Sequence, residues 1–158
     1  VHLIEEKYGK RLDAEIAMGA EKWVTTHRYP DTVSSLEALK AQGYRIVATV
    51  PDEKATYLED FDINYKSVFF FGTERKGLSQ EVLLNADELL TIPMVGFTQS
   101  LNISVSVAII LQYLTQKLRK SDLQWQLSAQ EQLETRLQWT KNSIRSLSDI
   151  LSRYYSIQ

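Results

Sequence analysis

The stretch of sequence that decides the fold runs from residue 67 to residue 118 and reads SVFFFGTERKGLSQEVLLNADELLTIPMVGFTQSLNISVSVAIILQYLTQKL. Two apolar runs in it, residues 68–71 and 89–92, each predict a β-strand, and a loop of small and polar residues follows each one. A helical pattern at 78–84 joins them, and a long apolar helix over 101–118 ends the stretch. Ligands of open α/β sheets bind just beyond the carboxyl ends of the strands. The stretch therefore predicts a ligand site made by two loops.

The rest of the chain continues the same alternation. Predicted strands recur near residues 24, 47, 69 and 90, with helical segments between them. A helix is expected from Asp31 or Thr32 to Leu39, and the run RIVATV that follows Gly43 predicts a buried strand. This order favours right-handed βαβ units, that is, an α/β fold with a mostly parallel sheet and helices on both faces.

Weaker patterns predict the remaining elements. We expect a helix over residues 10–18, a strand over 23–26 and a short helix over 53–60, with Ser100 as the N-cap of the long helix. Residues 1–4 look like the end of a strand, so we also expect further residues upstream of them.

Composition fits one ordinary globular domain with an appended segment. The chain has 158 residues, of which 44% are hydrophobic and 24% charged. It contains no cysteine, which excludes disulfides and a cysteine nucleophile and agrees with a reducing, cytoplasmic location. Its two histidines lack metal-ligand spacing, and no apolar run is long enough to cross a membrane.

The charge pattern alone is a poor indicator of a nucleic-acid partner. The net charge is -2, whereas nucleic-acid-binding domains are usually basic. Basic residues do cluster locally, at positions 7–11, 27–28, 75–76 and 117–120. Each cluster taken singly is equally well explained as solvated surface charge.

Familiar nucleotide-binding motifs are missing from the sequence. A P-loop needs Lys and Ser or Thr directly after its second glycine, but here Lys76 precedes Gly77 and Leu78 follows. No G-x-G-x-x-G follows a predicted strand, which argues against a dinucleotide site.

Two motifs in the deciding stretch carry a family resemblance. Residues 71–79, FGTERKGLS, resemble the second signature of the SpoU branch of the SPOUT RNA methyltransferases, and residues 92–105, IPMVGFTQSLNISV, resemble the third. They occur in the family order and spacing, and weaker similarity reaches back to about residue 12. The resemblance implies a C-terminal trefoil knot, a homodimer, and S-adenosyl-L-methionine as the methyl donor, with S-adenosyl-L-homocysteine as product and no metal.

The resemblance also implies a cofactor site. It assigns cofactor binding to Gly72, Ile92, Met94 and Leu101, and more weakly to Thr49. Gly72 would let the adenosine approach the backbone closely, because a side chain there would collide with it. Plain core packing is the alternative role of the three apolar residues.

Three polar residues are the candidates for catalysis. Methyl transfer to a ribose 2′-hydroxyl starts from an activated donor, so the enzyme must mainly align the acceptor and remove its proton. The resemblance gives these tasks to Glu74, Ser100 and Asn102. Helix capping is the alternative role of the last two. The family's first signature, with its catalytic arginine, is expected upstream of this chain, and no arginine here falls in that motif.

The C-terminal segment points to one branch of the family. We expect a methyltransferase domain over residues 1–120 and a helical extension over 121–158, which begins with a linker and a capping box at Ser128 and contains one helix, or two with a break near Asn142 and Ser143. Such an extension resembles the TrmH type, which methylates a D-loop guanosine, position 18, of tRNA. The alternatives are 2′-O-methylation of another tRNA or rRNA nucleotide, a non-catalytic RNA-binding module on this fold, and a binding protein for a small adenosine compound.

Overall fold

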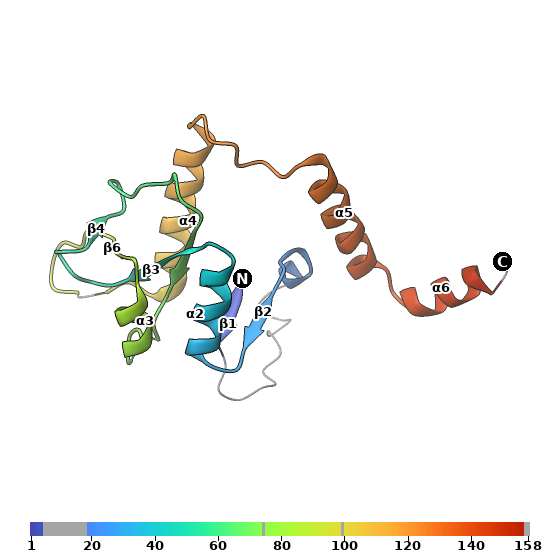
Figure 1. Ribbon diagram of the computed structural model, residues 1–158, viewed down its shortest axis with the longest axis horizontal. Coiled ribbons are helices and arrows are strands. Elements are labelled where there is room, and N and C mark those ends of the chain that lie inside the picture. The colour runs from blue at the N-terminus through green and yellow to red at the C-terminus, as the bar shows by residue number, and fades with distance from the viewer. Residues whose placement is uncertain (5–18, 74, 99, 157–158) are drawn as a thin grey trace. The chain divides into compact units, whose positions relative to one another are not determined.

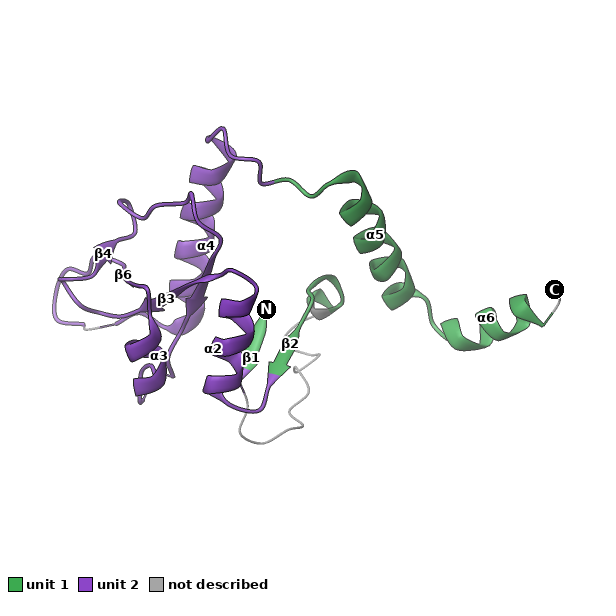
Figure 2. Ribbon diagram, viewed as in Figure 1, with its two compact units in different colours: residues 1–3, 7–28, 126–158 green, residues 4–6, 29–125 purple. Residues whose placement is uncertain are grey.

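The computed structural model describes residues 1–4, 19–73, 75–98 and 100–156. The chain forms two compact units, which Figure 2 shows in different colours. The larger unit comprises residues 4–6 and 29–125, and the smaller one comprises residues 1–3, 7–28 and 126–158. Each unit is described by itself below.

The larger unit is built on a four-stranded sheet (Figure 1). Its strand order is β4 (Thr56–Tyr57), β6 (Glu88–Thr91), β3 (Arg45–Thr49) and β5 (Ser67–Phe70), and every pairing is parallel. After β3 the chain forms β4 at one edge of the sheet, crosses to β5 at the opposite edge, and returns to place β6 between β3 and β4. The prediction of a mostly parallel α/β sheet is confirmed.

Helices cover both faces of this sheet, as predicted, because side chains alternate along β3. Ile46 and Ala48 pack in one core cluster with residues of α2 (Thr32–Ala41) and α3 (Gln80–Asn85). Val47 points to the other face. There it joins a second cluster with side chains of β6, the segment after β4 and α4 (Ile103–Arg119), namely Leu58, Phe61, Leu90, Ile110 and Leu114.

The smaller unit combines the first residues of the chain with its last two helices. β1 (His2–Ile4) pairs with β2 (His27–Tyr29), and a 3-10 turn, η1 (Ala20–Trp23), precedes β2. The helices are α5 (Ala129–Ser143) and α6 (Leu147–Tyr155). The Trp23 ring meets the Trp139 ring edge-on at 5.7 Å between centroids, and the Asn142 amide donates to the Lys22 carbonyl at 3.2 Å.

Local capping signals were predicted well. Asp31 caps α2 by accepting a hydrogen bond from the Ser34 N–H at 2.8 Å. Ser128 and Glu131 form the predicted capping box at the start of α5. The expected break after Ser143 is present, and it separates α5 from α6.

Three predicted elements are wrong. The strand expected over residues 23–26 is absent: Trp23 ends η1, and β2 begins only at His27, although the Thr25 carbonyl accepts a hydrogen bond from the Val1 amino group at 2.7 Å. Residues 53–60 form no helix, because Thr56 and Tyr57 pair with β6 as an edge strand and bury Leu58. The third wrong prediction is Ser100 as the N-cap of the long helix, which is described with the site below.

Other expectations receive no test from this structure. The helix expected over residues 10–18 lies outside the described residues. The domain boundary at residue 120 and the trefoil knot stay predictions. Within the described part of the chain, no helix is long and apolar enough to cross a membrane.

Candidate functional site

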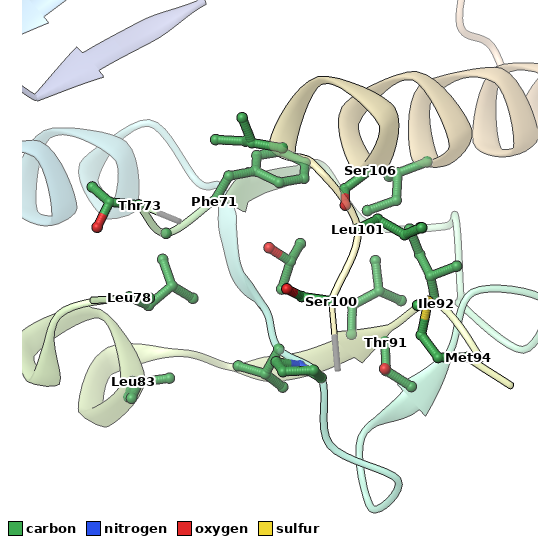
Figure 3. Close-up of a pocket in the computed structure, with 18 of the residues that line it drawn as sticks. Phe71, Thr73, Leu78, Leu83, Thr91, Ile92, Met94, Ser100, Leu101 and Ser106 are labelled. Atoms are coloured by element: carbon green, nitrogen blue, oxygen red, sulfur yellow. The ribbon is translucent and has the colours of Figure 1, made fainter. Parts of the chain in front are cut away.

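A cavity of about 420 Å³ opens at the carboxyl ends of β3, β5 and β6. Its walls come from three loops and two helices. The loops contribute residues 49–51 at the end of β3, residues 71–73 and 76–78 after β5, and residues 90–92, 94 and 100–101 at and after the end of β6. The helices contribute Leu83 of α3 and the first turns of α4. The labelled side chains in Figure 3 surround this space from the loops after β5 and β6, from α3 and from α4. The chain passes from β5 on one side of β3 to β6 on the other, so the loops that follow β5 and β6 diverge. Ligands of open α/β sheets usually bind at such a point.

The cavity brings together most of the predicted site residues. All five residues expected to bind cofactor line it, and so does Ser100. They are Thr49, Gly72, Ile92, Met94 and Leu101. Asn102 is outside the lining, at the start of α4. Glu74 lies outside the described residues.

The start of α4 corrects the expected cap. The helix begins at Ile103, and its N-cap is Asn102 instead of Ser100. The Asn102 side-chain oxygen accepts a hydrogen bond from the Ser104 N–H at 2.9 Å, which satisfies one of the free amides of the first turn. Ser100 is thereby left in the cavity wall (Figure 3). Capping also fixes where the Asn102 side chain sits, beside the loop that lines the cavity.

Gly72 is required by the loop itself. Two hydrogen bonds close the turn after β5, from the Thr73 N–H to the Gly77 carbonyl at 3.0 Å and from the Gly77 N–H to the Thr73 carbonyl at 2.8 Å. A Cβ on Gly72 would lie 2.1 Å from the Gly77 carbonyl carbon. A side chain at position 72 would therefore collide with the protein's own backbone even without a bound adenosine.

The hydroxyl of Thr49 has a structural partner. It donates to the Phe70 carbonyl at 2.8 Å, which joins the ends of β3 and β5 under the cavity. Thr49 also lines the cavity, although its hydroxyl is used by this hydrogen bond.

Sequence reasoning missed three polar groups of the wall. Thr91 and Ser106 present hydroxyls near the cavity (Figure 3), and Lys76 is the only charged residue among the described lining. Helical spacing could have revealed Ser106, because Ile103, Ser106 and Ile110 follow at intervals of three and four and share one face. Lys76 was visible in the second signature but was grouped with surface charge. The described residues contain no cluster of three or more potential metal ligands.

A match to a family model shows to which protein family the chain belongs. Residues 1–112 match the model of the SpoU rRNA Methylase family. The chain belongs to this family. The matched residues of this SpoU chain include all three loops that line the cavity and the first turns of α4.

Individual relatives agree with the family match. The chain is 41% identical over 146 residues to the tRNA (guanosine(18)-2′-O)-methyltransferase of Borreliella burgdorferi, covering 92% of this chain and 67% of that protein. It is 36% identical over 110 residues to the enzyme of the same name from Thermus thermophilus, covering 70% of this chain and 57% of that enzyme. Among solved structures, the A. aeolicus TrmH/SpoU tRNA modifying enzyme superposes with a TM-score of 0.76 at 28% identity, over 92% of this chain and 77% of that one.

Proposed function

We propose that this SpoU chain carries the core of a tRNA methyltransferase that modifies the ribose 2′-hydroxyl of guanosine 18. The observation that carries the proposal is the 41% identity to an enzyme of that name across 92% of the chain. The chain spans between 57% and 67% of the length of the two curated relatives above, so the activity of the whole protein is part of the proposal.

S-adenosyl-L-methionine is the proposed donor, and the cavity supports it. About 420 Å³ falls within the range of small-molecule pockets, which run from roughly 300 to 1,000 Å³. Apolar side chains from Ile92, Met94 and Leu101 suit an adenine ring, and nearby loop backbone offers donors and acceptors. The donor supplies a methyl group already activated by the sulfonium, so we propose that no metal ion takes part.

The chain's own residues then have the tasks of holding and aligning the acceptor. In the transfer, the methyl carbon leaves sulfur and bonds to the ribose 2′-oxygen, and the hydroxyl proton leaves to a base. We propose that Ser100, in the cavity wall, and Asn102, at the adjoining helix start, position the acceptor nucleotide. Glu74, which the resemblance places in the same site, is proposed to share this task.

Asn102 allows the catalytic and capping roles to be separated. We expect Asn102→Ala to lower both stability, by about 1 kcal/mol through the lost cap, and methyl transfer, by roughly 100-fold or more. Asn102→Asp keeps the acceptor oxygen of the cap but removes the amide donors, so stability should hold while transfer still falls. Urea unfolding and initial rates measure the two effects. Full activity in Asn102→Asp would leave capping as the residue's only role.

A homodimer and a knotted C-terminal half complete the proposal. The surface of α4 turned away from the sheet exposes large apolar side chains, including Val105 at 45% and Leu111 at 53% exposure, as expected if a second copy covers it. We also propose the trefoil knot and a cytoplasmic location, which the family resemblance and the proposed tRNA substrate support. Light scattering on the purified chain tests the dimer.

Transfer of a labelled methyl group tests the function directly. The chain is incubated with S-adenosyl-L-methionine carrying a radioactive methyl group and with a tRNA transcript. A matched transcript carries 2′-deoxyguanosine at position 18, and parallel reactions contain a metal chelator. We expect label in the first transcript only, with or without chelator. Equal labelling of both transcripts would point to another nucleotide, and cofactor binding without transfer would favour the non-catalytic module.

A further inference from the structure

We propose that Lys76 binds the carboxylate of the methionine part of the cofactor and so sets the orientation of the donor in the cavity. This inference rests on the proposed function, because it assumes that S-adenosyl-L-methionine occupies the cavity. Its starting point is the composition of the wall. Every other described lining residue is apolar, a glycine or a hydroxyl residue, and Lys76 alone carries a charge.

The ammonium group of Lys76 is not committed elsewhere in the described structure. No described carboxylate forms an ion pair with it. Its backbone is nevertheless held in place. The Lys76 N–H donates to the Thr73 hydroxyl at 3.2 Å, and the hydrogen-bonded turn between Thr73 and Gly77 encloses it. Lys76 is therefore an exposed cation, on a closed turn of the cavity wall, that forms no ion pair with the described residues.

The charges of the ligand select the group that Lys76 can bind. The donor carries two positive groups, its sulfonium and its ammonium, and one negative group, its carboxylate. A carboxylate moved into an apolar cavity loses solvation unless a cation compensates it, and Lys76 is the one such cation in the described wall. The positive sulfonium is repelled by the same ammonium group. Both effects place the carboxylate at Lys76 and the reacting methyl away from it.

A consequence follows for the product. Methyl transfer removes the sulfonium charge but leaves the carboxylate, so Lys76 holds S-adenosyl-L-homocysteine at least as firmly as the donor. Loss of Lys76 should therefore weaken product binding and lower product inhibition.

Calorimetry with two ligands and four proteins tests the assignment. The ligands are S-adenosyl-L-homocysteine and its decarboxylated analogue, which differ only in the carboxylate. The proteins are the wild-type chain, Lys76→Met, Lys76→Arg and Arg75→Met. Arg75 is a matched control, because it is an exposed cation on the same turn, as Lys76 is, but does not line the cavity.

The expected pattern is specific to one ligand and one residue. Lys76→Met should weaken S-adenosyl-L-homocysteine binding about fivefold, as for a charge-assisted contact made by an exposed lysine, and leave the analogue unchanged. Lys76→Arg should retain most of the affinity, and Arg75→Met all of it. Added salt should reduce wild-type affinity for S-adenosyl-L-homocysteine more than that of Lys76→Met.

Three results would overturn the assignment. Equal loss of both ligands in Lys76→Met would indicate damage to the turn. Unchanged binding of both, with a raised KM for tRNA, would assign Lys76 to an RNA phosphate. If the wild-type chain binds neither ligand, the cofactor site and the proposed function fail together, which separates that failure from a failure of Lys76 alone.

Discussion

The larger unit and the two C-terminal helices are stabilised in different ways. The larger unit buries side chains on both faces of a parallel sheet, with Ile46, Val47 and Leu90 fully inaccessible. Helices α5 and α6 bury no residue at all among those described. What defines α5 is local: a capping box at its start and side-chain hydrogen bonds one turn apart, such as Gln130 to Glu134 and Gln138 to Asn142.

This difference indicates where the free energy of unfolding resides. Burial of apolar surface dominates the stability of globular domains, whereas one cap or one helix-surface pair contributes little. The larger unit should therefore unfold cooperatively and set the global stability. The two C-terminal helices should respond mainly to local substitutions and to pH, unless a partner covers their apolar side chains.

The largest contrast is expected between two truncations of apolar side chains. Ile110 in α4 is 1% exposed, and Ile110→Ala should lower the free energy of unfolding by about 3 kcal/mol. Leu137 in α5 is 53% exposed, and Leu137→Ala should change it by less than about 0.5 kcal/mol. Urea unfolding of both variants provides the comparison. A loss of similar size in Leu137→Ala would mean that α5 is covered in solution, and dependence on protein concentration would identify a second copy as the cover.

A smaller loss is expected at the cavity turn. Gly72→Ala places a methyl group against the Gly77 backbone and should cost about 2 kcal/mol, with weaker binding of S-adenosyl-L-homocysteine. Gly77→Ala is the matched control, because its Cβ would meet nothing, although its φ of 67° favours glycine. Thermal unfolding followed with and without ligand measures both. If Gly72→Ala is as stable as the wild-type chain, the close approach of the turn is not what requires glycine.

The smallest expected effect is the pH response of α5. Hydrogen bonds from the Ser128 hydroxyl and N–H to the Glu131 carboxylate hold the pKa of Glu131 below its usual value. A lowered folded-state pKa gives stabilisation that is present above the usual pKa of glutamate and is lost as the pH falls through the lowered value. Circular dichroism should therefore show α5 losing helix at acidic pH. Glu131→Gln should remove this part of the response, and an identical titration in both proteins would contradict the role of the capping box.

The success of the sequence predictions also differs between local features and features that depend on distant parts of the chain. Patterns that depend on nearest neighbours were predicted correctly: the Asp31 cap, the capping box at Ser128 and the buried strand Arg45–Thr49. The parallel sheet followed from the alternation of elements. The short strand β4 was mistaken for a helix, because only pairing with β6, more than thirty residues later in the chain, makes it a strand.

The cavity was predicted in outline and missed in detail. Gly72, Ile92, Met94 and Leu101 of the two signatures do line the cavity, and their binding of a cofactor stays a prediction. The reason for Gly72 was not visible, since it depends on how a five-residue turn closes. Lys76 was overlooked as a lining residue, because its place in the cavity wall depends on how the turn after β5 closes.

The position of α4 in the chain has a consequence for biosynthesis. β3 pairs on both sides with strands made after it, and α4, made later still, supplies Ser106 and Ile110 as the last wall of the cavity. A nascent chain that has emerged only as far as β6 thus has all four strands but no closed binding site. Since domains form as units during synthesis, the cavity closes only when the larger unit has finished folding. A small molecule that binds in the cavity would then stabilise the newly completed fold by mass action.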